Sequence, residues 1–464
     1  MQSGPDRTSN AGTPRQADLP PLTNSLPAVE QRAAMPHGFR AGGLAAGIKP
    51  SGRPDLGVIA TTGESAAVAA TFTRNQVVAA PIRLSRAHLN ATEATGGGKF
   101  GWTDALVTTS GSANAATGVE GDTDQAEVNK TLASLLDTKP ERTLAMSTGV
   151  IGVRLPMARV RDGLARLIPQ LAESDAALEA VAGAMMTTDT KIKLATTSLE
   201  LPGADGELVK VTVTGIAKGV GMIHPKMATM LSVILTDASV APATLFDILS
   251  PIVQRTWNQI SVDGDTSTND TVFVLASGAS GASVPPASQA AAQLSEAIEA
   301  VARSLARQQA ADGEGATTLI TCQVSGAADN YDARAIARSV VCSSLFKAAV
   351  HGRDPNWGRV AGAAGNARLP DEQMLEAAGL HHTEAAPRAG RAPELDLDKL
   401  QIAICGTLVF KGEPLFFDRA AVRAAMDAPE VLIRLHLGLS GGTGEAFGCD
   451  LTEGYVIENA EYTT

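Results

Sequence analysis

Hydrophobic and polar positions alternate most regularly just before the middle of the chain. In residues 207–217, β-branched side chains recur with polar side chains between them, which predicts a strand. After a turn that contains two glycines, the apolar run at 227–235 predicts a second strand. Similar short runs predict further strands at 56–60, 67–72, 105–109, 271–276, 400–410 and 431–439.

Other parts of the chain either have the helical spacing of alanine and leucine, which predicts helices, or lack any periodicity. Residues 364–398 are polar and contain three prolines, so we expect an irregular surface insertion there. Residues 1–32 are rich in Pro, Ser, Thr and Asn without periodicity, and are predicted to be disordered. Helices are predicted at 123–136, 156–171, 175–186, 243–257, 289–309 and 333–350.

Composition agrees with a mixed α/β enzyme that has many tight turns. The 464 residues are 44% hydrophobic and include 45 glycines, enough for a large core and, by length, two or three domains. The formal charge of −11 argues against a nucleic-acid surface. No apolar run has the length of a membrane span or a secretion signal, so we expect a cytoplasmic protein without a membrane partner.

Cysteines and histidines give no pattern typical of a metal site. The four cysteines contain no C-x-x-C pair, and the seven histidines are scattered without ligand spacing. We expect Cys322, Cys342, Cys405 and Cys449 to be buried, reduced and structural.

The turn at 218–221 and the run after it carry the candidate chemistry. The sequence here is K-G-V-G-M-I-H-P-K-M-A-T-M-L, from Lys218 to Leu231. On pattern alone, Thr229 would be a packed strand threonine. The segment nevertheless resembles the self-cleavage segment of the ornithine acetyltransferase (glutamate N-acetyltransferase) family, the bifunctional enzymes of arginine biosynthesis. Further blocks follow the family's order at 147–152, 186–190, 262–271, 312–317, 354–359, 448–452 and 459–464.

The resemblance implies cleavage between Ala228 and Thr229, giving an α chain of 1–228 (folded from residue 33) and a β chain of 229–464. Thr229 would then be an N-terminal nucleophile whose α-amino group, with a pKa of about 7.7–8, accepts the hydroxyl proton. The implied fold is a layered sandwich of helices and β-sheets of the N-terminal-nucleophile type. The implied assembly is a heterotetramer of two α and two β chains.

The implied reaction moves the acetyl group of N-acetylornithine to glutamate in a ping-pong cycle through acyl-threonine. It needs no metal or nucleotide cofactor, although acetyl-CoA is a possible alternative donor. Other readings stay open: a relative that uses another amine or acyl group, an amidase or aminopeptidase with the same threonine, or an uncleaved binding protein.

Site residues are carried over from the family's motifs. Thr148 and Gly149 would stabilise the oxyanion, although a plain S-T-G turn that begins a helix is the ordinary interpretation. Lys218 would hold a substrate carboxylate, and Glu314 would bind the amino group or carry a proton. Substrate contacts are further implied for Thr187, Asn459 and Thr464, each of which would otherwise be an unremarked loop or terminal residue.

The chain departs from the family's pattern in three places. The usual N-S-G-N-A-N-A is T-S-G-S-A-N-A at 109–115, and the usual G-E-G-A-T-K ends in Thr318. The family's G-S-G-M-I-A-P-N-M is G-V-G-M-I-H-P-K-M at 219–227, which introduces His224 and Lys226. We expect these two residues to have a local structural or specificity role, and the departures bear on which acceptor is used.

Overall fold

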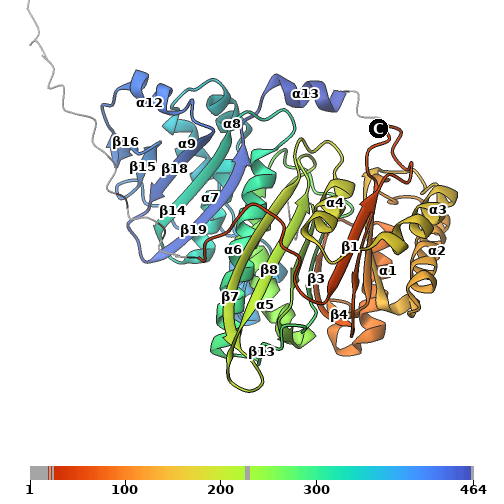
Figure 1. Ribbon diagram of the computed structural model, residues 1–464. Helices are drawn as coiled ribbons and strands as arrows, with labels where there is room; N and C mark the ends of the chain where they lie inside the picture. The colour runs from red at the N-terminus through yellow and green to blue at the C-terminus, as the bar shows by residue number, and fades with distance from the viewer. Residues whose placement is uncertain (1–18, 20–21, 23–25, 225–229, 461–464) are drawn as a thin grey trace, which may run out of the picture.

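The computed structural model describes residues 19, 22, 26–224 and 230–460 (Figure 1). Four residues of the analysis above, Lys226, Ala228, Thr229 and Thr464, lie outside this range. In the part of the chain that is described, no helix is long and apolar enough to cross a membrane.

A six-stranded sheet forms the centre of the molecule. Its strand order is β4-β3-β12-β9-β8-β7, and β12 and β9 are parallel while the other neighbours are antiparallel. Every residue of β9 and β12 is buried, as expected for strands rich in Val, Ile, Leu and Phe in a sheet covered on both faces. The strands are β3 (Ala66–Phe72), β4 (Phe100–Thr103), β7 (Lys193–Pro202), β8 (Leu208–Lys218), β9 (Leu231–Thr236) and β12 (Thr271–Ala276).

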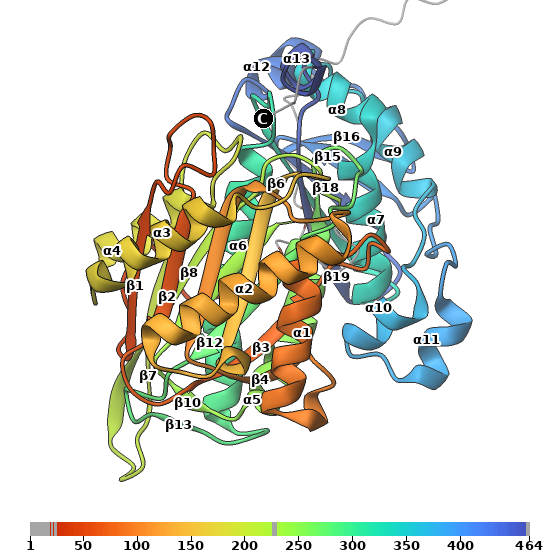
Figure 2. The same cartoon turned by 90° about the vertical axis from the view of Figure 1, so that its right-hand side faces the viewer.

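A four-stranded sheet, β1-β2-β5-β6, lies beside the central sheet, in front of it in Figure 2, and shares a core of helices with it. The helices α1 (Ala80–Thr92) and α4 (Asp175–Met185) share one apolar core with both sheets. The outer face of the small sheet carries α2 (Gly118–Leu136) and α3 (Met157–Leu167). Its strands are β1 (Phe39–Leu44), β2 (Leu56–Thr61), β5 (Ala105–Ser112) and β6 (Thr143–Val150).

The other face of the central sheet packs against α5 (Pro242–Arg255) and α6 (Gln289–Ala311). Helix α6 also contacts a seven-stranded sheet of order β11-β19-β14-β18-β15-β16-β17, seen at the left of Figure 1. That sheet has its own core with α7 (Asn330–Cys342), α8 (Ser344–His351) and α9 (Trp357–Gly365). Its strands are β11 (Ile260–Ser261), β14 (Leu319–Ala327), β15 (Gln401–Ile404), β16 (Thr407–Lys411), β17 (Glu413–Pro414), β18 (Glu430–His436) and β19 (Gly442–Cys449).

The predicted mixed α/β fold, with helices layered on sheets, is therefore confirmed. The predicted helix at 333–350 is wrong in one respect, because the Ser343 hydroxyl accepts the N–H of Phe346 and starts a new helix, α8. The predicted strand at 400–410 is a hairpin of β15 and β16, since Cys405 and Gly406 both have positive φ.

Described residues in two segments, one predicted to be irregular and the other disordered, form helices or backbone hydrogen bonds. Residues 364–398 contain two short helices, α10 (Glu372–Ala377) and α11 (His382–Arg388), each capped at its start by a side chain. Within the predicted disordered extension, Glu30 exchanges two backbone hydrogen bonds with Thr196 of β7, at 2.8 and 2.9 Å. An edge strand thus supplies order that local composition does not encode.

Short elements complete the chain. The described residues also include α12 (Arg419–Ala425) and, crossing the top of Figure 1, α13 (Glu453–Ala460). A pair of two-residue strands, β10 (Ser239–Val240) and β13 (Ser283–Val284), lies apart from the three sheets.

Candidate active site

One cavity of about 330 Å³ gathers the candidate residues. It lies where β6 and β8 end, and its wall is completed by the turns after α4 and α6 and by α13. Met230, the residue that follows Thr229, also lines it. Every predicted site residue that the structure describes lines this cavity: Thr148, Gly149, Thr187, Lys218, Glu314 and Asn459.

Lys218 is the last residue of β8 and only 8% exposed. Its ammonium donates to the hydroxyls of Thr187 at 2.8 Å and Thr148 at 3.1 Å. Burial lowers the pKa of Lys218, while the carboxylate of Asp189, 4.0 Å away, acts in the opposite direction. The Lys218 ammonium is therefore a positive charge at the cavity wall, and Asp189 neutralises it only in part.

The buried carboxylate of Asp189 attracts the Lys218 ammonium and is itself held by several donors. It accepts from Lys193 and from the backbone N–H of Gly219, at 2.7 and 2.8 Å. Burial would raise the pKa of Asp189, but Lys218, Lys193 and the Gly219 N–H outweigh it and lower the pKa to about 2. Lys193 is fully buried and also binds Asp312 at 2.7 Å, so a charge network holds the end of β8 against the turn after α6.

Thr148 and Gly149 lie inside β6, so the interpretation of S-T-G as the start of a helix is wrong. Gly149 has a φ of 131°, and a Cβ there would overlap the backbone of Gly111 on the neighbouring strand. Only glycine therefore allows the two strand ends to approach so closely. The Thr148 hydroxyl is held by Lys218, which places a hydroxyl and a glycine backbone side by side at the cavity wall.

Glu314 enters the cavity from the turn after α6. Its carboxylate accepts from Thr188 at 2.8 Å and from the amide of Asn459 at 2.9 Å. The carboxylate passes directly over Gly221, where a Cβ would overlap it. The glycine at 221 thus lets the chain approach Glu314 closely, while the backbone N–H of Glu314 donates to the carbonyl of Val220 at 2.9 Å.

The departures at 109–115 and 318 have structural partners. The Ser112 hydroxyl donates to the carbonyl of Val153 at 2.6 Å. Thr318 is buried and donates its backbone N–H to Asp450 at 2.9 Å. The three residues that differ from the family's pattern here, Thr109, Ser112 and Thr318, are not among the residues that line the cavity.

Several polar residues of the cavity or its support were not singled out from the sequence, among them Asp189, Asn269 and Asp270. The blocks that contain them were noted, but a run of polar residues does not tell which side chains point into a cavity. The role of Asp189 depends on its burial beside Lys193 and Lys218, and the sequence does not show this burial.

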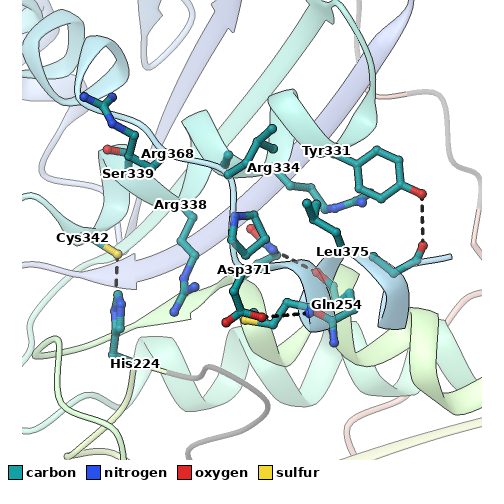
Figure 3. A pocket seen from close by; sticks show the side chains of 16 residues that line it. His224, Gln254, Tyr331, Arg334, Arg338, Ser339, Cys342, Arg368, Asp371 and Leu375 are labelled. Atoms are coloured by element: carbon teal, nitrogen blue, oxygen red, sulfur yellow. Dashed lines mark hydrogen bonds between the residues drawn. The ribbon is translucent and has the colours of Figure 1, made fainter. Parts of the chain in front are cut away.

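His224 faces a different cavity, of about 400 Å³ (Figure 3). Its Nδ1 lies 3.1 Å from the Ser261 hydroxyl and 3.6 Å from Cys342 Sγ. The lining also includes Arg338 of α7 and Asp371, and none of the lining residues is shared with the first cavity. The local role predicted for His224 stays a prediction, and the histidine is not among the residues that line the cavity of Lys218.

Comparison with known proteins decides the family. The protein-family model described as "ArgJ family" matches residues 40–464, which are most of the chain. The chain belongs to the ArgJ family. ArgJ relatives include the arginine biosynthesis bifunctional protein ArgJ of Synechocystis, 41% identical over 94% of this chain and 98% of that protein. The Deinococcus radiodurans ArgJ is 42% identical over 96% of this chain and 100% of its own length.

Among solved structures, ArgJ of Bacillus halodurans is 38% identical and covers 50% of this chain and 100% of its own, with a TM-score of 0.44. The Mycobacterium tuberculosis ornithine acetyltransferase complexed with ornithine is 35% identical over 43% of this chain and 99% of its own, with a TM-score of 0.38. As an ArgJ family member, the chain is an acetyltransferase of arginine biosynthesis.

Proposed function

We propose that this cavity transfers the acetyl group of N-acetylornithine to glutamate through an acyl intermediate on Thr229. One observation carries the proposal: Lys218, Glu314, Thr148 and Gly149 line a single cavity, together with the residue that directly follows Thr229. A cation for a carboxylate, an acceptor for an amine and an oxyanion pair are what this reaction requires.

Acylation begins when the Thr229 hydroxyl attacks the amide carbon of the donor, and its proton passes to the threonine's own α-amino group. The negative charge that develops on the carbonyl oxygen is stabilised by the Thr148 hydroxyl and the Gly149 N–H. The C–N bond then breaks, ornithine leaves with the proton, and an ester to Thr229 remains. Glutamate nitrogen attacks this ester by the reverse sequence and loses its proton.

Lys218 has the same task for both substrates, because N-acetylornithine and glutamate each carry an α-carboxylate. A buried cation that is only partly compensated gains more from a carboxylate than an exposed lysine does. Glu314, already an acceptor for Thr188 and Asn459, would receive the amino group of the acceptor substrate. The proposed cycle uses no metal or nucleotide, and acetyl-CoA is retained as a possible second donor.

Self-cleavage between Ala228 and Thr229 is part of the proposal. The strand pairing supports continued association of the two products, because β8 precedes the proposed cut and β9 follows it. β3 and β12 form a second antiparallel pair with one strand on each side of the cut. We propose that the α and β chains stay joined in this way and assemble as two of each.

Intact-mass spectrometry of the wild type and of Thr229→Ala tests the cleavage. Two masses in the wild type and one in the variant are expected. Release of ornithine from N-acetylornithine should require glutamate, with equal amounts of acetylglutamate formed. Release in water without glutamate would instead establish an amidase, and a single uncut mass in the wild type would remove the mechanism.

A further inference from the structure

Asn269 is a buried amide at the wall of the cavity that holds Lys218. It is 6% exposed and lies in the segment between β11 and β12. Its nitrogen donates to the carbonyls of Ala113 and Ser147 at 2.6 and 2.9 Å, and to the Ser147 hydroxyl at 3.1 Å. Its side-chain oxygen accepts the hydroxyl of Thr268 at 2.6 Å. Because protein groups bind both ends of the amide, Asn269 acts on the protein backbone rather than on a substrate.

The segment that carries this amide is itself held in place. The backbone N–H of Asn269 donates to the Ser267 hydroxyl at 3.1 Å, and its carbonyl accepts the Thr271 hydroxyl at 2.9 Å. The Ser267 carbonyl accepts the hydroxyl of Thr73, which follows β3, at 2.7 Å. The position of the amide is therefore set by the central sheet, through β3 and β12.

The proposed oxyanion pair, residues 148–149, lies between two backbone points that are both bound to Ala113. On one side, the Ala113 carbonyl accepts the Ser147 hydroxyl at 2.6 Å, in addition to the amide of Asn269. On the other side, the Ala113 N–H donates to the carbonyl of Val150 at 3.0 Å. Asn269 also binds the Ser147 carbonyl, so it ties the start of the pair to Ala113.

The Ser147 carbonyl determines where the oxyanion pair begins. A peptide group is planar, so a carbonyl held by a hydrogen bond also fixes the N–H and the Cα of the next residue, Thr148. The Thr148 hydroxyl is held separately by Lys218, at 3.1 Å. Donors stabilise a developing oxyanion most when they are already aimed at it, because no reorganisation is then needed during the reaction. A residue that fixes this backbone therefore contributes to the rate without touching the substrate.

We propose that Asn269 is a positioning residue for acetyl transfer, whose amide fixes the backbone of Ala113 and Ser147. The Thr148 hydroxyl and the Gly149 N–H thereby stay aimed at the carbonyl oxygen of the acyl group. This inference rests on the proposed function, in which those two groups stabilise the oxyanion. Asn269 belongs to the proposed β chain and its two backbone partners to the proposed α chain, so hydrogen bonds between the cleavage products set the geometry of the site.

The test uses two substitutions of Asn269 in the full-length protein. Asn269→Asp keeps the shape and the acceptor for Thr268 but replaces the donating nitrogen by an oxygen, and Asn269→Ala removes the amide without adding charge. The matched control is Asn129→Asp in α2, a fully buried amide that donates to the Thr143 hydroxyl at 2.9 Å and is not among the residues that line the cavity. Intact mass gives the extent of cleavage, thermal unfolding gives Tm, and steady-state kinetics give kcat and KM.

For both cleaved Asn269 variants we expect kcat to fall roughly 10- to 100-fold, because small displacements of reacting groups have effects of this size. KM should change less than about threefold, since the positioned groups act mainly in the transition state. N129D should also have a lower Tm, because it too loses a buried donor, but its kcat should stay within about twofold of the wild type.

A double-mutant cycle with Thr148→Ala separates positioning from general destabilisation. If Asn269 acts through the oxyanion pair, its substitution should matter less once the Thr148 hydroxyl is gone. We expect the loss of kcat in the double variant N269D/T148A to be at least about fivefold smaller than the product of the two single losses.

A wild-type kcat in both Asn269 variants would overturn the proposal, as would losses that multiply in the cycle or an equal fall of kcat in N129D. If neither Asn269 variant yields folded, cleaved protein, Ser147→Ala decides, because it removes only the hydroxyl in this network. A fall in kcat of roughly 3- to 10-fold with unchanged KM then supports the role, and a wild-type kcat overturns it. Failure of the proposed function is seen separately, as cleavage of T229A or absence of acetyl transfer in the wild type.

Discussion

The cavity lined by Lys218 and the cavity lined by His224 take residues from one short stretch of chain, and they differ in how their polar groups are held. Lys218 and Glu314 in the first cavity are tied to acceptors and donors on other elements, and charges of opposite sign alternate from Lys193 through Asp189 to Lys218. In the second, Figure 3 shows the Arg338 side chain extending between His224 and Asp371, and Leu375 also lines this cavity. Only the first combines a positioned cation, an acid and a glycine-lined strand end.

The comparison shows that distance along the chain is a poor guide to function here. His224 is five residues from Thr229, yet it lines the second cavity, whereas Asn459 lies more than two hundred residues away and bonds Glu314. Four predictions test this difference between the two cavities.

Thr148→Ala should have the largest effect. Loss of one oxyanion donor lowers kcat by about 10²–10³, and Lys218 also loses one of its two hydroxyl partners. Steady-state kinetics of acetyl transfer would measure this, with Thr148→Ser as the matched control that keeps the hydroxyl. If Ala and Ser variants retained equal, near-wild-type kcat, the hydroxyl would have no part in the reaction.

Gly221→Ala should come next, since its new Cβ would displace the carboxylate of Glu314. We expect a loss in kcat/KM of roughly 10- to 100-fold, comparable with removal of a hydrogen bond to a charged group. Gly183→Ala in α4 is the control, because a Cβ there meets open space. Equal kinetics for the two variants would mean that Glu314 tolerates movement or is not used.

The network behind Lys218 predicts a dependence of stability on acid. The pKa of Asp189 is lowered to about 2, so its contribution is complete above its ordinary pKa of about 3.8 and is lost as the pH falls through 2. Near neutral pH this contribution is about 2 kcal/mol of unfolding free energy. Denaturant unfolding of wild type and Asp189→Asn between about pH 2 and 6 would measure it.

In Asp189→Asn, the acid-dependent part of the unfolding free energy should shrink, and at neutral pH the variant should be less stable by about 3–5 kcal/mol because Lys193 loses one carboxylate partner. A variant with wild-type stability at neutral pH and the same acid profile would contradict the assigned network.

Features that depend on local residue patterns could be predicted from the sequence, whereas features that depend on contacts between distant residues could not. β12 was predicted at its observed bounds, and β8 within one residue, because burial imposes local patterns that periodicity reveals. Family motifs supplied Lys218 and Glu314. The contact between Thr188 and Glu314 joins residues 126 apart, so no local pattern contains it. The order of residues 26–32 likewise depends on β7, and the break at Ser343 depends on one capping bond.

His224→Gln should have the smallest effect, and it tests the comparison most directly. The histidine bonds Ser261 and Cys342 in the second cavity, so we expect kcat and KM of acetyl transfer to stay within about threefold of the wild type, in the range of a surface or local structural change. Glutamine keeps one donor and one acceptor, which limits local disturbance. Kinetics combined with intact-mass analysis would separate an effect on cleavage from one on transfer. A loss of kcat as large as that of Thr148→Ala, in fully cleaved protein, would show that the two cavities act as one site through the stretch that joins His224 to Met230.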